Sequence, residues 1–193
     1  MRHVLFCAIL VSTLARPAQA EDVTIVLDFR EPASDQAIAE MKHEFAGIMK
    51  GSKLTFEWKS PAEAEQTSAD NLVVVRFKGA CVLKPVPYLF DERGPMAVAY
   101  SGQDGVMPFS EVECDQVTRA VRSAMWGGDL ARADVVMGRA LGRVLAHEMV
   151  HMLTKSPAHG RAGVARPALT GSQLVRPELR LMPEDLDRLR SDR

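Results

Sequence analysis

The alternation of apolar and polar positions along the chain predicts strands interleaved with helices. Residues 23–29 (VTIVLDF) are rich in β-forming residues and apolar on both faces, which is typical of a buried strand. Residues 54–58 and 72–77 predict two further strands, and shorter ones are expected at 97–100 and 106–112. This order favours an α+β fold in which a mixed sheet packs on helices.

Apolar residues at helical spacing predict a helix that Ser34 or Asp35 caps and Gly51 ends, and another over residues 114–125. The polar segment after the second strand is expected to form surface with one helical turn. The longest helix is predicted over residues 130–153, and its second half is apolar nearly all round, so we expect it to be buried.

Two glycines in that long helix, Gly138 and Gly142, stand four residues apart. Each costs about 1 kcal/mol of helix propensity relative to alanine. Their missing side chains would allow a second backbone to approach the helix closely.

The first twenty residues (MRHVLFCAILVSTLARPAQA) predict a secretory signal peptide, with a basic start, an apolar run and a small-x-small end at Ala18-Gln19-Ala20. The apolar run is shorter than the about 20 residues that span a bilayer, which favours cleavage over an anchor. Cys7 lies inside the run, which disfavours a lipoprotein. The remaining 193 − 20 = 173 residues, 21–193, are expected to form one domain in the periplasm or outside the cell.

The composition of the mature chain limits the classes of partner that we expect for it. The chain has 24 Lys+Arg, of which Arg2 and Arg16 leave with the signal, and 25 Asp+Glu, so the mature charge is 22 − 25 = −3. Without a basic excess we expect no nucleic acid partner, and without a second long apolar run no stable membrane anchor. Nothing in the pattern specifies an oligomeric state. Two cysteines remain, Cys81 and Cys114, and an exported protein with an even pair favours a disulfide between them.

The candidate chemistry lies at the end of the long helix, in HEMVHMLTKSPAHG. His147 and His151 fall on one helical face, where two imidazoles can bind one Zn²⁺. Glu148, one residue round, is placed to act as a general base toward water and to return the proton to a leaving amine. A catalytic zinc ion needs a third ligand, and His159 is favoured because only a short chain reversal separates it from the helix. Glu178 and Glu184 are the alternatives.

The stretch LGRVLAHEMVHMLTKSPAHGRAGVARPALTGSQLV resembles the core of a bacterial, metzincin-like group of exported zinc metallopeptidases. In that group HExxH is followed by a third His after seven residues and then by a Gly-Ile-Met-like turn. The resemblance implies a zincin fold with a buried active-site helix, zinc ligation by His147, His151 and His159, and Glu148 as general base. It also implies a short closing helix within LRLMPEDLDRLRSDR.

The chain departs from the group where a methionine should lie beneath the zinc ion. Its sequence there is Gly163-Val164-Ala165, so Ala165 takes that place, and Met182 is a distant substitute. We therefore expect a secreted zinc-dependent endopeptidase acting on peptides or proteins. The alternative is a secreted domain that binds zinc for a binding or structural role without cleaving.

Three further features could serve the substrate of such an enzyme. Residues 106–112 could be the edge strand along which a peptide lies, although a plain sheet strand is an equal reading. Tyr88 and Tyr100 are the only tyrosines, which makes them candidates for stabilising an oxyanion.

Overall fold

The computed structural model describes residues 21–66, 68–69, 71–84, 94–126, 129–176 and 178–191. The predicted signal peptide and Tyr88 lie outside these residues. Five strands form one sheet in the order β2-β1-β3-β5-β4, with β1, β2, β3 and β5 parallel and β4 antiparallel to β5. The strands are β1 (Glu21–Phe29), β2 (Leu54–Lys59), β3 (Leu72–Lys78), β4 (Ala97–Gly102) and β5 (Gly105–Glu113).

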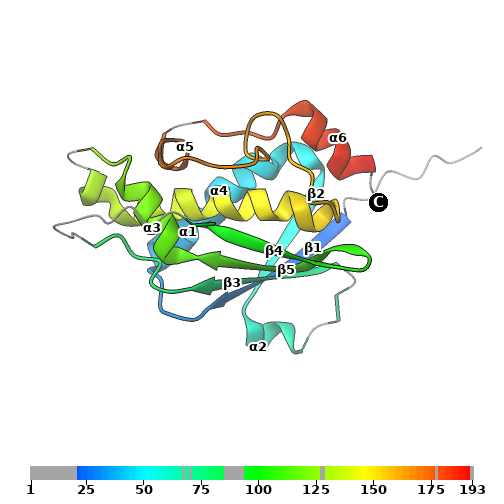
Figure 1. The fold of residues 1–193 in the computed structure, drawn as a ribbon. Helices are drawn as coiled ribbons and strands as arrows, with labels where there is room; N and C mark the ends of the chain where they lie inside the picture. The colour runs from blue at the N-terminus through cyan, green and yellow to red at the C-terminus, as the bar shows by residue number, and fades with distance from the viewer. Residues whose placement is uncertain are drawn as a thin grey trace, which may run out of the picture.

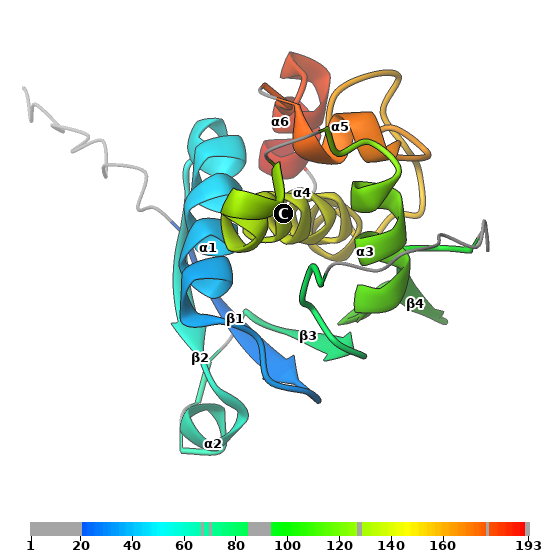
Figure 2. The ribbon, with the colours of Figure 1, turned by 90° about the vertical axis from the view of Figure 1, so that its left-hand side faces the viewer.

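The helices lie mainly on one face of this sheet. Figures 1 and 2 show α1, α3 and α4 against the sheet, with α5 and α6 on the far side of α4 and α2 at the opposite face. The helices are α1 (Asp35–Met49), α2 (Pro61–Ala64), α3 (Cys114–Arg122), α4 (Ala133–Leu153), α5 (Gly171–Val175) and α6 (Pro183–Ser191). The predicted α+β fold, with a mixed sheet packed on helices, is confirmed. No helix among the described residues is long and apolar enough to cross a membrane.

Helix α1 crosses α4 at the two glycines of α4. A Cβ atom at Gly138 would lie 2.5 Å from the carbonyl oxygen of Ala37, and one at Gly142 would lie 2.7 Å from that of Met41. Any larger residue would therefore push the helices apart, because real Cβ atoms do not approach backbone oxygens this closely. The expectation that these glycines admit a neighbouring backbone is confirmed.

Close packing also buries a charged residue of α4. Arg143 of α4 is only 1% exposed. Its Nε donates to Glu44 Oε1 of α1 at 2.7 Å, and its Nη1 donates to the carbonyl oxygens of Gln173 and Arg176, both at 2.5 Å. A buried guanidinium with these partners ties α1, α4 and α5 together.

Three predicted details differ from the structure. The turn Asp129–Arg132 is a 3₁₀ helix, and α4 begins only at Ala133. Helix α5 was not predicted from the sequence, because five residues are too few to show a periodic pattern; the capping box of Thr170 and Gln173 was its local signal. Strand β5 pairs with both β3 and β4, so the segment 106–112 is interior and the prediction of an edge strand there is wrong; β4 is the edge.

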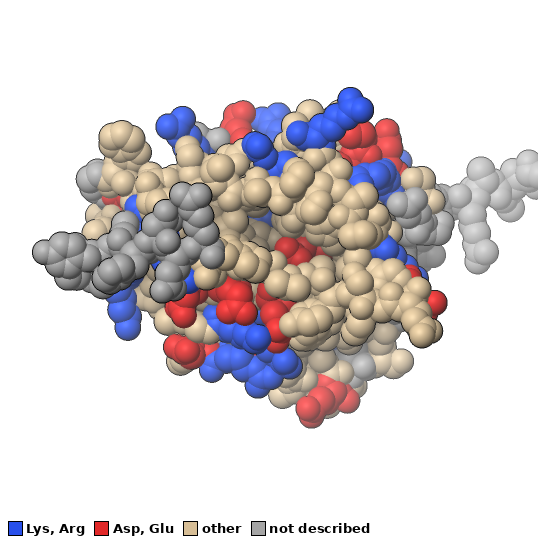
Figure 3. Space-filling view, in the orientation of Figure 1, with Lys and Arg blue, Asp and Glu red and all other residues tan. Residues whose placement is uncertain are grey.

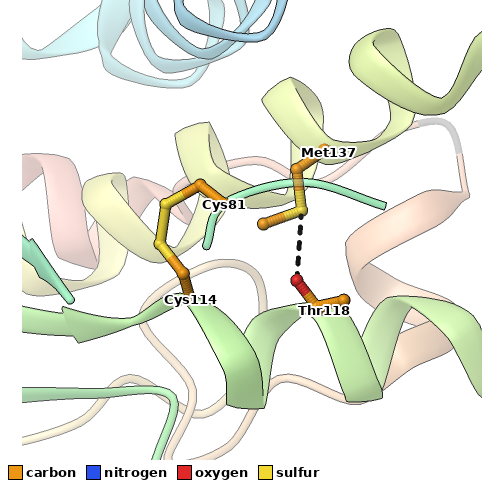
Figure 4. The surroundings of a disulfide bond; sticks show 4 residues. All are labelled: Cys81, Cys114, Thr118 and Met137. Carbon is orange, nitrogen blue, oxygen red and sulfur yellow. Dashed lines mark hydrogen bonds between the residues drawn. A yellow bond between two sulfur atoms is a disulfide. The ribbon is translucent and has the colours of Figure 1, made fainter. Parts of the chain in front are cut away.

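Cys81 and Cys114 form the expected disulfide, which joins the segment after β3 to the first residue of α3 (Figure 4). Both cysteines are buried, and their Cα atoms are 4.8 Å apart. Beside the disulfide, the Thr118 hydroxyl of α3 points to the sulfur atom of Met137 of α4. The disulfide therefore lies where α3 packs against α4. The bridge closes the part of the chain that carries β4 and β5.

Removing this bridge should destabilise the fold measurably. We expect the double variant Cys81→Ala/Cys114→Ala to lose about 3–4 kcal/mol of unfolding free energy, because the unfolded chain gains the entropy of an open loop. Urea denaturation of the variant and of the wild type would measure the difference. Reduced wild-type protein should match the variant, and equal stability of oxidised and reduced wild type would contradict the prediction.

Candidate metal centre

Two imidazoles from consecutive turns of α4 face each other with their unprotonated nitrogens. His147 Nδ1 lies 2.9 Å from the carbonyl oxygen of Val164, and His151 Nδ1 lies 2.8 Å from that of Ser156. A carbonyl only accepts, so each Nδ1 carries the proton and each Nε2 keeps its lone pair. The two Nε2 atoms are 3.2 Å apart.

The chain reverses after α4 and returns His159 to the same place. Helix α4 ends at Leu153, and Lys155 takes the left-handed conformation (φ 49°) that commonly follows a helix end. Ser156 then stabilises the turn, since its N–H donates to the carbonyl oxygen of His151 and its Oγ accepts from the N–H of Ala158. The predicted short local reversal is therefore present.

The three histidines form the group of metal-ligating side chains in the described residues, with their donor atoms within 4.8 Å of one another. Their ring centroids lie 4.8, 5.4 and 4.7 Å apart. Tetrahedral ligands at the 2.0–2.1 Å typical of zinc–imidazole bonds are about 3.3 Å apart. The 3.2 Å separation between the His147 and His151 Nε2 atoms fits this value.

The chemistry of these nitrogen atoms also suits a shared cation. Two imidazole lone pairs at 3.2 Å repel each other unless a shared positive group lies beside both. Exposed His159 can turn toward the same point, whereas His147 and His151 are held by their Nδ1 bonds. The residues present therefore fit a zinc ion bound by three imidazoles.

Burial shifts the acid–base properties of the centre. Loss of water lowers the pKa of His147 to about 4, although the bond to Val164 opposes the shift. Burial likewise lowers the pKa of His151. Both rings are thus neutral at pH 7, which is the form that binds a metal.

Glu148 points into the site from α4 and is 4% exposed. Its Oε1 lies 4.0 Å from His147 Nε2, and its Oε2 accepts from the hydroxyl of Ser110 at 3.3 Å. Burial raises the pKa of Glu148 to about 7, while the bond from Ser110 acts in the opposite direction. A carboxyl group with this pKa can exchange a proton at neutral pH.

Ser110 was not predicted from the sequence as part of the site. It lies on β5 at a fully buried position, and its hydroxyl can donate to the carbonyl oxygen of Val98 of β4 at 3.1 Å as well as to Glu148. A signal was present, because Ser110 shares the core-facing register of Val106 and Val112. A serine on the apolar face of a strand implies a buried polar partner.

An open cleft of about 250 Å³ exposes the histidines between β4 and the loop that follows α4. Figure 3 shows the molecule hollowed along this line, with acidic atoms at the bottom of the hollow. A second cavity, of about 230 Å³, adjoins His147 and Glu148. Its other lining residues are small or apolar: Gly94, Pro95, Met96, Ala97, Val144, Pro167, Ala168 and Leu169.

Other candidates from the sequence lie elsewhere. Glu178 and Glu184 are exposed and absent from the histidine group, and Glu178 forms an ion pair with Arg180. Tyr100 donates to Glu111 at 2.5 Å, on the face of the sheet opposite Ser110 and Glu148. Tyr100 therefore points away from the centre, and its prediction as an oxyanion group is wrong.

The loop below the histidines holds Ala165 where the resemblance led us to expect a methionine. Ala165 is 2% exposed, and its carbonyl oxygen accepts from the N–H of Gly160 at 2.7 Å. Met182 lies beside Gly163, whose φ of 69° and contact with Arg180 leave no room for a side chain. Ala165 is thus buried against Gly160 within this loop.

No model of a protein family matches the chain, and no curated protein sequence matches it. Among solved structures, the chain is similar to the crystal structure of archaemetzincin from Methanopyrus kandleri, with 10% sequence identity, a TM-score of 0.48, and coverage of 93% of this chain and 98% of that chain. The residue roles proposed below rest on the geometry of the site itself.

The opposite pKa shifts of His147 and Glu148 predict an unusual pH dependence in metal-free protein. Unfolded His147 takes up a proton near pH 6.5 and folded His147 only near pH 4, so stability is lost as the pH falls between these values. Folded Glu148 takes up its proton near pH 7 and unfolded Glu148 near 4.5, so stability is gained over that fall. Each effect is about 2 kcal/mol between pH 7 and pH 5.

We therefore expect Glu148→Gln to lose about 2 kcal/mol more unfolding free energy than the wild type when the pH falls from 7 to 5. Denaturant titrations in the presence of a chelator would measure this difference. Glu184→Gln removes an exposed carboxyl and serves as the control, with a wild-type profile. Parallel profiles for the wild type and Glu148→Gln would refute the assignment.

Proposed function

We propose that the chain is a zinc-dependent endopeptidase that hydrolyses peptide bonds outside the cytoplasm. The observation that carries the proposal is the pair of unprotonated His147 and His151 Nε2 atoms, 3.2 Å apart, beside the buried Glu148 carboxyl and within an open cleft. His159 supplies the third imidazole. Three imidazoles with one position left open are typical of catalytic rather than structural zinc sites.

When bound, the zinc ion supplies a Lewis acid that polarises the scissile carbonyl group and makes water a nucleophile at neutral pH. The protein supplies the proton transfer. Glu148 accepts a proton from the attacking water through Oε1, which faces His147, and then delivers it to the amine that leaves. Without a metal, the pKa of Glu148 is about 7, so both the ionised and the protonated form are populated at neutral pH. A bound cation would lower this pKa and favour the ionised form, which accepts the proton.

Ser110 holds the other oxygen of the carboxyl group. When Glu148 is ionised, the hydroxyl proton of Ser110 turns to Oε2; when Glu148 is protonated, that proton turns to the carbonyl oxygen of Val98. A single rotation thus satisfies both states without exposing either group to water.

The substrate is expected to lie as an extended strand against β4. This strand is the edge of the sheet, and Ala97, Ala99 and Ser101 line the cleft that contains the histidines. An edge strand offers unpaired backbone N–H and C=O groups to an added strand. Small side chains on this face leave room for the peptide.

The cavity beside His147 and Glu148 would take one substrate side chain. Its volume of about 230 Å³ exceeds the roughly 150 Å³ that can hold a benzene-sized group. Apolar residues such as Val144 and Leu169 form its walls, so an apolar side chain is favoured there over a charged one.

The disulfide supports action outside the cytoplasm, since such bonds persist in oxidising compartments. The predicted signal peptide agrees with this location. The alternative function, zinc binding without cleavage, is motivated by Ala165, and the experiments below separate the two.

Purified protein should bind about one equivalent of zinc, measured by metal analysis after dialysis. His147→Ala and His151→Ala should abolish this binding because each removes a fixed ligand. His43→Ala is the matched control, since His43 is exposed on α1 and should bind no zinc. Zinc retained in the His147→Ala variant would contradict the assignment of the site.

Glu148→Gln should retain zinc and lose peptide hydrolysis by a factor of about 10²–10⁴, because the amide cannot accept the proton. Cleavage of an unbiased peptide library, followed by mass spectrometry, gives the rate. If the wild type binds zinc but cleaves no peptide in the library, the chain is a binding or structural domain instead.

The same library should show enrichment of large apolar residues on one side of the scissile bond. Leu169→Ala enlarges the cavity and should shift the preference toward bulkier aromatic residues by about 1–3 kcal/mol of discrimination. Leu130→Ala, at an exposed position outside the cavity, is the control. A preference for charged residues would contradict this use of the cavity.

A further inference from the structure

The C-terminal helix α6 contacts the turn that carries His159. Arg188 Nη1 donates to the carbonyl oxygen of Ala158 at 3.3 Å. The carboxylate of Asp185 lies against Gly160, where an added Cβ atom would be 2.7 Å from Oδ1. The residues on both sides of His159 therefore contact one helix.

Arg188 and Asp185 also bind each other. Arg188 Nη2 donates to Asp185 Oδ1 at 2.6 Å, and the side chain of Asp185 is completely buried. A buried carboxylate is costly unless a partner holds it, so this pair is fixed in one geometry. The pair then gives the turn a rigid support, as Arg188 uses its second nitrogen to hold Ala158.

Gly160 is enclosed from the other side as well. Its N–H donates to the carbonyl oxygen of Ala165 at 2.7 Å, and a Cβ atom at Gly160 would lie 3.2 Å from the Cβ of Ala165. The turn is thus clamped between α6 and the loop below the histidines. The ring of His159 is exposed, so its position depends on this backbone clamp rather than on packing around the ring.

We infer that Asp185 and Arg188 are positioning residues that hold His159 at the metal, so that affinity for zinc depends on the docking of α6. The inference rests on the proposed zinc site. Neither residue belongs to the group of ligands, and both act through the backbone of residues 158–160.

A second ion pair on α6 provides a control for the effect of changing Asp185. Asp187 and Arg190 repeat the same spacing and form an ion pair at 3.1 Å, but the Asp187 side chain is 74% exposed. Asp187→Asn therefore makes the same chemical change on the same helix, at a pair that does not face the turn.

The experiment measures zinc affinity by competition with a chromogenic chelator and the visible absorption of the Co²⁺-loaded protein. Asp185→Asn should weaken zinc binding about tenfold or more, as is typical when the support of a metal ligand is removed. It should also weaken the Co²⁺ absorption bands, because the third imidazole leaves. Asp187→Asn should match the wild type in both measurements.

Combination with His159→Ala separates positioning from a general loss of structure or a change in charge. Once His159 is absent, Asp185→Asn should cause no further loss of zinc affinity. An equal tenfold loss in that background would overturn the inference. Arg188→Gln, which keeps the buried carboxyl but loses the contact with Ala158, should behave as Asp185→Asn does and replaces it if that variant does not fold.

The outcomes also distinguish the two proposals. Wild-type zinc binding that disappears in His147→Ala but is unchanged in Asp185→Asn and Arg188→Gln would overturn the positioning role alone. A wild-type protein that binds no zinc would overturn the proposed function and this inference with it.

Discussion

The contact between α1 and α4 is the constraint on which the rest of the structure depends. At Gly138 and Gly142 the two helices meet backbone to backbone, and this brings α4 deep into the layer above the sheet. The next two turns of α4 carry His147 and His151, so the depth of the helix fixes the depth of the histidines. Their lowered pKa values and the raised pKa of Glu148 follow from that burial.

Burial also explains why the polar groups around the centre each have a hydrogen-bond partner within the protein. A buried or half-buried imidazole needs a hydrogen-bond partner for its second nitrogen, and the carbonyl oxygens of Val164 and Ser156 supply these partners from two separate loop positions. Those bonds select the tautomer that leaves both Nε2 atoms free for a metal. The support of a metal centre in this chain is thus largely backbone, supplied by the segment that follows α4.

Much of the framework could be predicted from sequence because it depends on local periodicity. The strands, α1, the long helix and the HExxH pair each produce a repeating pattern or a fixed spacing within a few residues. The order of the strands in the sheet produces no such local pattern. We expected residues 106–112 at an edge, but β5 pairs in parallel with β3 as well as antiparallel with β4, so it is interior. The face to which Tyr100 points depends on the register of β4 against β5, which places Tyr100 beside Glu111, and the sequence pattern does not specify that register.

Contacts between segments that are distant in the chain account for the other features that could not be predicted from the sequence. Arg143 is buried because Glu44, 99 positions away, and the end of α5 enclose it. The partners of the turn at Ala158 and Gly160 lie in α6, which is about 25 residues further along the chain. Neither set of contacts produces a pattern in the sequence, because each depends on how helices that are distant in the chain pack together.

The disulfide has a consequence for how the cleft holds together. Cys81 and Cys114 bracket β4 and β5, so the strand wall of the cleft belongs to a covalently closed segment. The opposite wall, with the histidines and the loop after α4, lies outside that segment and is held by packing, hydrogen bonds and the ion pair of Asp185 with Arg188. The two walls should therefore respond to different reagents: a reductant would open the disulfide-closed segment that carries the strand wall, and a chelator would remove the proposed zinc ion from the helix wall.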